Sequence, residues 1–305
     1  MTTSPTLSTD ETSRSESGPS AATVPTSRVR ACWTLYWLTL RQHLHGRRWM
    51  AVALLFLLPA GMAILFRTMH SGVPSLFLEF VLLWILIPQA LLPLVALLYG
   101  SGIIQDEQED QTITYLLIRP LPKWLIYWTK MAATWTTTVL LVVLLTALTD
   151  AAIYAASGAD LRTALLHCLQ AAAILSLAAI AYCSLFGAIS LLTKRTLIVG
   201  ILYVALVEGL LASFPLSLRW ATVIYYTRLM AYHTLDFVVT WPRGKQDDVA
   251  AAAWFLNTDS DPTLAEHPQF STCVLVLLGV SLSGTAVAGW LCSRREFHVK
   301  TPEKE

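Results

Sequence analysis

Six long apolar segments constrain this 305-residue chain more than any other feature of its sequence. A helix needs about 20 residues to cross the hydrocarbon core of a bilayer, at a rise of about 1.5 Å per residue. The segments that meet or approach this length are residues 49–66, 76–104, 125–148, 164–192, 197–214 and 273–292. The sequence therefore predicts an all-α membrane protein with six transmembrane helices.

Composition supports this fold class and argues against several others. The chain is 55% hydrophobic and 13% charged, so it has too few polar residues to cover a globular surface of this size. A net charge of +1 without a basic patch gives no sign of nucleic-acid binding. The five cysteines form no CxxC pair and the seven histidines are scattered, so neither a disulfide framework nor a metal site is expected.

The lysines and arginines predict how the chain crosses the membrane. Six spans place both termini on one side, and basic residues favour the cytoplasmic side. Fourteen of the 21 basic residues fall on the side of the termini, six fall on the other side, and Arg14 lies in the tail. Both termini are therefore expected in the cytoplasm.

The segments outside the spans have distinct compositions. Residues 1–28 are rich in Ser, Thr and Pro and predict a disordered cytoplasmic tail, without the apolar core of a signal peptide. Residues 29–298 form the expected membrane domain, and residues 299–305 form a second cytoplasmic tail. Residues 29–45 carry tryptophans and leucines at helical spacing, which predicts an amphipathic helix in the membrane interface. The alternative is a polar lead-in to the first span.

The largest connection, residues 215–270, lies on the external side in this topology. It mixes many aromatic residues with a few charged ones, and then becomes polar. A disordered loop would not carry so many aromatics, so we expect helices packed against or dipping into the outer leaflet. This segment is expected to cover the external end of a pathway.

A dense polar stretch, residues 99–130, separates the second and third expected spans. Its charges run from acids through a short apolar helix to bases: Asp106, Glu107, Glu109 and Asp110, then Ile113, Leu116 and Leu117, then Arg119, Lys123 and Lys130. This order complements a helix dipole, with Thr112 as the N-cap. Pro120 and Pro122 then end the helix. The pattern predicts a cytoplasmic helical elbow.

The sequence contains no phosphate-binding G-x-x-x-x-G-K-[ST] loop and no G-x-S-x-G serine motif. Any ATPase that drives this chain must therefore be another polypeptide. Ser281, Thr285 and Gly289 share one face of the last span, as do Gly279 and Ser283, and such small residues allow membrane helices to approach closely.

Ionisable residues inside spans are costly and are therefore candidates for function. Glu208 lies within the fifth expected span, where it either lines a translocation path or is hydrogen-bonded to a neighbouring helix near the external boundary. Glu79, Asp150 and His167 lie near span ends and are expected to be interfacial.

The elbow resembles that of the ABC-2 type permeases, the membrane subunits of ATP-driven exporters. The family pattern runs from an acidic residue through Gly-Thr and a leucine-rich helix to a proline, a base and a lysine near the next span. The matching positions here are Glu107, Gln111-Thr112, Leu116-Leu117, Pro120, Lys123 and Lys130. Gln111 stands where the family usually has glycine.

The resemblance implies a transport subunit without catalytic activity of its own. Two permease subunits, either two copies of this chain or this chain and a paralogue, would line a path in the inner (plasma) membrane. Two separate nucleotide-binding subunits would bind ATP and Mg, so this chain would hold no cofactor. The resemblance implies a coupling region made of Asp106, Glu107, Gln111, Thr112, Arg119, Pro120, Lys123 and Lys130.

Two other functions remain open at the level of sequence. One is a structural membrane anchor for a complex, which would use the charged elbow as a docking point. The other is an intramembrane hydrolase that uses Ser283 with His167, since both residues lie in apolar spans. The hydrolase lacks a recognised motif and an evident oxyanion site.

Overall fold

The computed structural model describes residues 28–45, 47–69, 73–109, 122–155, 160–193, 195–213, 217–241, 245–254 and 268–294. Long helices dominate these residues: α1 (Arg28–His45), α2 (Arg47–Met69), α4 (Leu92–Glu109), α6 (Lys123–Tyr154), α7 (Leu161–Leu192) and α11 (Phe270–Arg294). The shorter elements are α3 (Ser75–Glu79), η1 (Phe80–Leu91), α8 (Thr196–Tyr203), η2 (Val204–Leu210), η3 (Leu211–Ser213), η4 (Ser217–Ala221), α9 (Val223–Thr234), β1 (Val238–Thr240), β2 (Gln246–Asp248) and α10 (Val249–Trp254).

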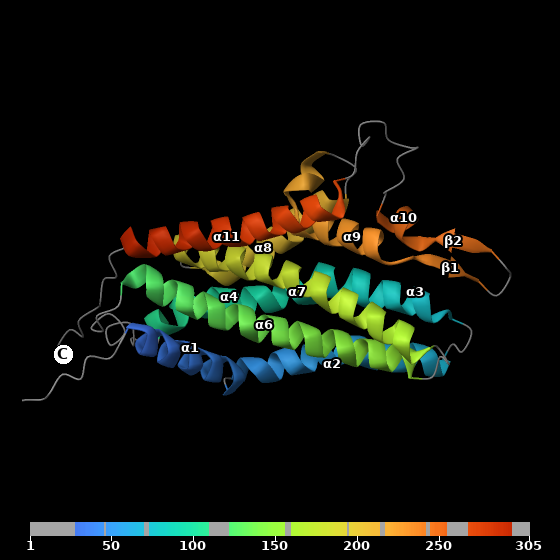
Figure 1. The fold of residues 1–305 in the computed structure, drawn as a ribbon, viewed down its shortest axis with the longest axis horizontal. Helices are drawn as coiled ribbons and strands as arrows, with labels where there is room; N and C mark the ends of the chain where they lie inside the picture. The colour runs from blue at the N-terminus through green and yellow to red at the C-terminus, as the bar shows by residue number, and fades with distance from the viewer. Residues whose placement is uncertain are drawn as a thin grey trace, which may run out of the picture.

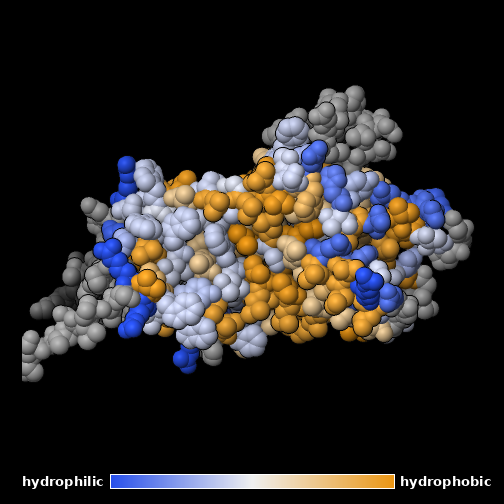
Figure 2. Space-filling model, in the orientation of Figure 1, coloured by the Kyte–Doolittle hydropathy of each residue, from blue (hydrophilic) through white to orange (hydrophobic). Residues whose placement is uncertain are grey.

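The long helices run side by side along one axis and form an elongated bundle (Figure 1). We call the end where α4 and α11 finish and α6 begins the proximal end, and the opposite end the distal end. Figure 2 shows hydrophobic side chains across the middle of one long face, with most strongly hydrophilic residues toward its two ends. This distribution matches a bundle whose middle is in contact with lipid.

Five helical segments in the described part of the chain are long and apolar enough to cross a bilayer. They are Trp49–Met69, Ser75–Ile103, Lys123–Tyr154, Leu161–Leu192 and Phe270–Arg294. Each overlaps one of the expected spans, with ends that differ by a few residues. The expectation of an integral, multi-pass, mainly helical membrane protein is confirmed.

The fifth expected span, residues 197–214, differs from its prediction. The apolar helix there is Thr196–Leu210, made of α8 and the π-helical η2, and the short 3₁₀ turn η3 follows it. Fifteen residues at a rise of about 1.5 Å give a length of about 22 Å, short of the roughly 30 Å of a bilayer core. The apolar sequence continues beyond Leu210, but the regular helix does not.

The second span departs from a regular α-helix near a proline. Pro88 lies inside η1, a π-helical segment between α3 and α4. Proline has no N–H to donate and clashes with the preceding turn, and a π-helical stretch is one way to absorb that defect. The span stays continuous from Ser75 to Ile103.

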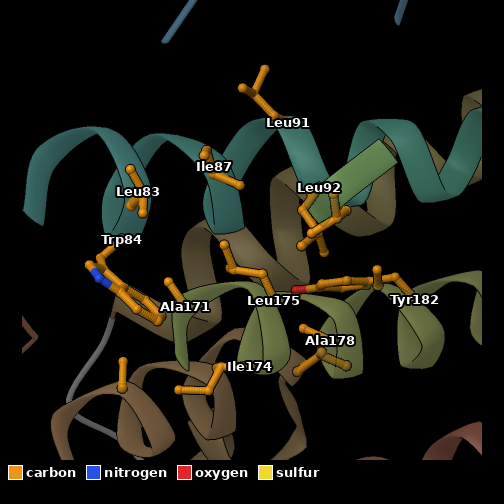
Figure 3. Packing of buried hydrophobic residues seen from close by; sticks show 14 of the residues in the cluster. Leu83, Trp84, Ile87, Leu91, Leu92, Ala171, Ile174, Leu175, Ala178 and Tyr182 are labelled. Carbon is orange, nitrogen blue, oxygen red and sulfur yellow. The ribbon is translucent and has the colours of Figure 1, made fainter. Parts of the chain in front are cut away.

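The core lies mainly between the η1–α4 span and α7. Trp84, Ile87 and Leu175 are fully buried there. Figure 3 shows Trp84 and Leu92 turned toward α7, which presents Ala171 and Tyr182 to them. Alanines on α7 let the two helices approach closely, and the larger side chains of η1 and α4 fill the space between them.

The predicted packing face of the last span is confirmed for one of its two sets of small residues. Thr285 is fully buried and its Oγ1 donates to Ser184 Oγ over 3.2 Å, and a Cβ on Gly289 would lie 2.9 Å from Trp128 Nε1. For the other set, Gly279 and Ser283, the prediction of close packing is wrong. Ser283 is exposed, and a Cβ on Gly279 would meet nothing within 4 Å, so this face of α11 lies outside the bundle.

The long connection between α8 and α11 contains helices, as expected, and also two strands that the all-α prediction missed. β1 and β2 pair antiparallel with Val239 opposite Asp247. The run Val238-Val239-Thr240 is β-branched throughout and favours a strand once it has a partner. Phe237 beside this hairpin packs against Phe80 and Trp254. The hairpin is therefore attached to the distal end of the bundle.

The amino-terminal helix forms as predicted and packs on the bundle through one face. Leu35 and Thr39 are buried, whereas Trp33 and Trp37 are 67% and 60% exposed. Tyr36 Oη donates to Thr136 Oγ1 on α6 over 2.9 Å. The exposed tryptophans suit a headgroup region, and placement of α1 in the membrane interface stays a prediction.

Candidate functional site

The predicted coupling residues fall at the proximal end, where α4 ends and α6 begins. Lys123 and Lys130 lie in the first turns of α6. Asp106 and Glu107 lie in the last turn of α4, with their side chains outside the described set. Residues 110–121 of the elbow lie outside the described chain, among them the predicted coupling residues Gln111, Thr112, Arg119 and Pro120. The structure thus describes the two helix ends that flank the elbow, the end of α4 and the start of α6, which we call the base of the elbow.

Pro122 starts α6 as the sequence predicts. It occupies the N-cap position with φ −65° and ψ 140°, and its carbonyl accepts from the backbone N–H groups of Leu125 and Ile126. Proline fits this position because the first N–H groups of a helix have no partner within the helix. The direction in which the chain leaves the elbow is therefore fixed by α6.

Lys130 joins the two sides of this base. Its side chain is 4% exposed, and Nζ donates to the carbonyl oxygen of Ile103 over 2.8 Å. Ile103 belongs to the last turns of α4, a helix that contains no Lys or Arg of its own. A buried ammonium on a helix carbonyl near its C-terminal end also complements the helix dipole. Lys130 therefore connects the span before the elbow to the span after it.

Gln105 makes a second connection, which the sequence analysis missed. Its Nε2 donates to the carbonyl oxygen of Thr193 over 3.2 Å and to Thr196 Oγ1 over 2.6 Å. These two residues form the turn between α7 and α8. The signal in the sequence was a single amide, Gln105, at the end of an apolar run. The end of α4 is thus tied to the α7–α8 turn as well as to α6.

An apolar cluster fills the space behind these polar contacts. Its buried members come from α4, α6, α7 and α11: Ile103, Tyr127, Met131, Leu191, Ala288 and Cys292. Gly187 on α7 allows the close approach, since a Cβ there would lie 2.5 Å from Met131 Cε and 2.7 Å from Tyr127 Oη. The Cys292 thiol also donates to the carbonyl oxygen of Lys123 over 3.9 Å. The base of the elbow is a packed unit.

The close packing of α4, α6, α7 and α11 at the base of the elbow allows a movement of one helix to displace the others. Close-packed helices resist independent movement, and hydrogen bonds to backbone carbonyls fix their register. A force on the elbow would therefore move the ends of α4 and α6 together, and Gln105 would carry the movement to α7 and α8. Rigid-body motion of packed elements is a common form of conformational transmission.

Glu208 is fully buried in the interior of the bundle and caps the start of α9. It contacts Tyr182, which lies 10 residues from the proximal end of α7 and 21 residues from its distal start. Its carboxylate accepts from the backbone N–H of Val223 over 3.1 Å and of Ile224 over 3.0 Å. Tyr182 Oη and Tyr203 Oη donate to the same carboxylate over 2.8 and 3.1 Å. A negative charge at the first N–H groups of a helix satisfies donors that have no partner within it. Glu208 is therefore hydrogen-bonded to neighbouring helices.

Glu208 belongs to the π-helical segment η2, and Arg228 of α9 contacts the other π-helical segment, η1. Its Nη2 donates to Gln89 Oε1 of η1 over 3.4 Å, and its guanidinium lies 6.0 Å from the centre of the Trp254 ring. Burial lowers the pKa of this guanidinium, while Tyr182 and Glu208 act in the opposite direction. Each π-helical segment thus contributes one polar residue that holds α9.

The structure does not bring together the two residues of the hydrolase alternative. His167 Nδ1 lies 3.6 Å from Glu79 Oε2 near the start of α7, whereas Ser283 Oγ donates to its own helix at the carbonyl of Val280. Thr285 contacts Ser184 of α7, so Ser283 lies level with that part of α7. Seventeen residues of helix separate His167 from Ser184, about 25 Å along the axis. These residues therefore form no catalytic pair.

Within the described ranges, no group of three His, Cys, Asp or Glu side chains could hold a metal ion. The candidate site is the packed contact of α4, α6, α7 and α11 at the proximal end, with Lys130 and Gln105 as its polar connections.

Comparison with known proteins adds one finding. Residues 33–230 match a family model described as ABC-2 family transporter protein. The matched range runs from α1 into α9 and includes the elbow, Lys130 and Glu208. A search of curated proteins gave no match.

Proposed function

The chain belongs to the ABC-2 transporter family, and from that premise we propose that it works as the permease of an exporter driven by a separate ATPase. The membrane helices would line the translocation path together with a second permease subunit, either a copy of this chain or a paralogue. ATP and Mg would bind to the partner ATPase, because this chain carries no phosphate-binding loop.

The observation that carries the coupling part of this proposal is the base of the elbow. Lys130 joins α6 to the carbonyl of Ile103 on α4, and Gln105 joins α4 to the α7–α8 turn. In the proposed mechanism the ATPase pair docks on the elbow with Glu107, Thr112, Arg119, Pro120 and Lys123 at the contact. When the ATPases close, they push on the elbow and tilt the joined spans, with ATP supplying the energy difference between the two states.

We assign the proximal end to the cytoplasm. Fourteen basic residues fall on the side of this end in the expected topology and six on the other, and such a bias favours the cytoplasmic side. The distal end then faces the external side of the plasma membrane. The helix α9 begins beside Glu208 inside the bundle, and Phe237 after it packs against Phe80 toward the distal end. Held by Glu208 and Arg228, α9 would cover the external end of the path, so Glu208 would act on translocation through the position of α9.

The test is a charge exchange across the elbow, measured on the purified complex with its ATPase. The variants are Glu107→Lys, Lys123→Glu and the double exchange. The proposal predicts that each single change lowers the ATPase stimulation given by the permease, and that the double exchange lowers it too, because both charges then oppose the partner surface that they meet. Asp247→Asn at the distal end serves as the control, because Asp247 is 40% exposed and paired with Lys245. Unchanged stimulation in both single variants would contradict the proposal.

A further inference from the structure

A group of ionisable side chains at the distal end has no role in the proposed coupling. We call it the distal polar cluster: Glu79 of α3, Asp150 and Tyr154 of α6, and His167 of α7. The sequence placed Glu79 and Asp150 at an interface with water, but they are 2% and 4% exposed. Burial follows because α3, the end of α6 and the start of α7 pack together. Buried carboxylates near a membrane are costly and need a compensating partner.

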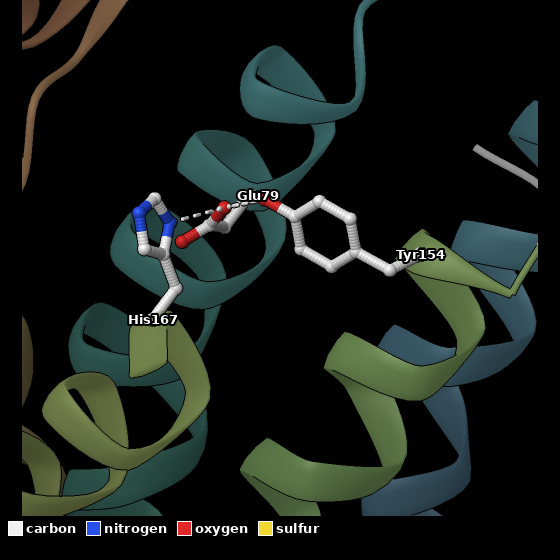
Figure 4. A network of polar contacts seen from close by, with 3 residues as sticks. All are labelled: Glu79, Tyr154 and His167. Atoms are coloured by element: carbon white, nitrogen blue, oxygen red, sulfur yellow. Dashed lines mark hydrogen bonds and ion pairs between the residues drawn. The ribbon is translucent and has the colours of Figure 1, made fainter. Parts of the chain in front are cut away.

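Glu79 is the centre of the cluster. Tyr154 Oη donates to Glu79 Oε2, and His167 Nδ1 lies 3.6 Å from the same oxygen. Figure 4 shows Tyr154 and His167 turned toward Glu79 from opposite sides. The His167 side chain is 24% exposed, so it connects the buried carboxylate to the surface.

Asp150 is the member of the cluster whose carboxylate oxygens are buried without a hydrogen bond in the described part of the chain. Neither Oδ1 nor Oδ2 has a hydrogen-bond partner that satisfies distance and angle criteria within the described residues. Glu79 and His167 act on it electrostatically, and the Cys168 thiol, a weak donor, lies beside it. An ionised carboxylate without partners and close to a second carboxylate would be strongly disfavoured in this setting.

The other charged groups around the cluster do not remove this imbalance. Arg67 of α2 faces Tyr154, and its Nη2 donates to the carbonyl oxygen of Ile153. Asp236, which follows α9, adds a further negative charge near His167. Among the described residues, the charged groups around the cluster are thus three carboxylates and, when the imidazole is neutral, one guanidinium. The cluster therefore carries an excess of negative charge.

We propose that the Glu79–Asp150 pair binds a proton, which enters from the aqueous phase at the distal end through His167. A proton fits better than a metal ion, because the described residues offer no three-ligand metal group and a proton needs no cavity. His167 is six residues from the first residue of α7, about 9 Å from the helix end, so the imidazole bridges water and the pair.

The transfer balances as a simple relay. The imidazole accepts a proton from hydronium on its exposed side, which leaves water, and gives its Nδ1 proton to Glu79 Oε2. One of the two carboxyl groups is then a carboxylic acid and the other stays a carboxylate. In this state the pair carries one negative charge. Loss of the proton leaves two buried negative charges that act on one another, and their repulsion loosens the contact among α3, α6 and α7.

The direct test is infrared difference spectroscopy of the full chain in lipid nanodiscs, without any ATPase, with the pH raised stepwise. The proposal predicts a protonated-carboxyl band at neutral pH that disappears at alkaline pH and is absent from Asp150→Asn. Absence of the band in the wild-type chain, or its persistence in Asp150→Asn, overturns the proposal. A band that responds to sodium at fixed pH would assign the pair to a metal cation and would also overturn it.

Thermal unfolding gives an independent readout on the same samples. The melting temperature of the wild-type chain should fall as the pH rises past proton loss, because the two carboxylates then repel. In Asp150→Asn and Glu79→Gln the melting temperature should no longer fall with pH, because only one ionisable carboxyl group of the pair remains in each variant. The control Asp247→Asn should keep the pH dependence of the wild-type chain. Retention of the wild-type slope in both variants overturns the proposal. Because no ATPase is present, these results do not depend on whether coupling occurs at the elbow.

Discussion

At the scale of single residues, Lys130 carries most of the argument for coupling. Its ammonium reaches the carbonyl oxygen of Ile103 from a different span, 27 positions along the chain. Lys130→Met keeps an unbranched side chain and removes this donor. A charged hydrogen bond contributes about 1.5–3 kcal/mol net. Since about 1.4 kcal/mol is a factor of ten, amide hydrogen exchange in the last turns of α4 should rise about tenfold or more.

The control is Lys130→Arg, which keeps a charged donor and should remain closer to the wild-type exchange rate. Equal protection of α4 in Lys130→Met and in the wild-type chain would show that the contact with Ile103 does not hold the two spans together.

Glu208 gives the second prediction at this scale. Its carboxylate accepts from two backbone N–H groups and two tyrosines, and an amide in its place has one oxygen and a donor group that faces other donors. A buried donor without a partner costs about 1–3 kcal/mol, so Glu208→Gln should lower the free energy of unfolding by at least this amount. Denaturant unfolding followed by tryptophan fluorescence measures it.

Tyr203→Phe is the matched comparison, because it removes one hydrogen bond to Glu208 and leaves both backbone contacts in place. Its expected cost is smaller, about 1 kcal/mol. If Glu208→Gln is no more destabilising than Tyr203→Phe, the carboxylate does not cap α9.

At the scale of elements, Gly187 controls how closely α7 approaches α6. A side chain there would collide with Met131 and with the buried Tyr127, whereas one at Gly279 would meet nothing within 4 Å. Overpacking a tight contact costs about 1–3 kcal/mol, so Gly187→Val should lower the thermal stability of the chain in detergent. Gly279→Val introduces the same side chain into a helix on an open face and should change it little. Similar melting temperatures for the two variants would contradict the packing at the base of the elbow.

The elements also show what local sequence could and could not reveal. Hydropathy was enough to place α2, α6, α7 and α11, because a bilayer requires long apolar helices whatever their neighbours are. It failed after Tyr203, where the α-helix gives way to the π-helical segment Val204–Leu210 and then to the 3₁₀ turn Leu211–Ser213, although most of the residues remain apolar. Glu208 of this segment contacts the backbone of α9, and hydropathy does not describe such a contact.

For the candidate site, the sequence indicated some of the polar residues but not the partners that they contact. Lys130 stood out as a base at the end of the elbow, but its partner is a backbone carbonyl, which has no signature in the sequence. Gln105 contacts residues 88 and 91 positions away, and Glu79 meets His167 across two helices. Such pairs depend on helix packing, so ionisable residues near span ends could be identified as candidates but not matched to one another.

At the scale of the whole molecule, the orientation in the membrane is open to a direct test. Lys245 at the distal hairpin is 75% exposed, and Arg30 lies on the exposed surface of α1 at the proximal end. In a cysteine-free background, a membrane-impermeant maleimide should label Lys245→Cys on intact cells and should label Arg30→Cys after the membrane is opened. The reverse pattern would place the proximal end outside the cytoplasm.

The central claim is that a separate ATPase docks on the elbow at the proximal end. The most direct measurement is photo-crosslinking in native membranes, with a photoreactive amino acid at Gln111 and, as the distal control, at Lys245. After purification of the tagged chain, mass spectrometry identifies the crosslinked protein. The account predicts an ATPase with a phosphate-binding loop, captured from position 111 and not from position 245. Crosslinks to such an ATPase from position 245, or a chain that captures none from position 111, would contradict it.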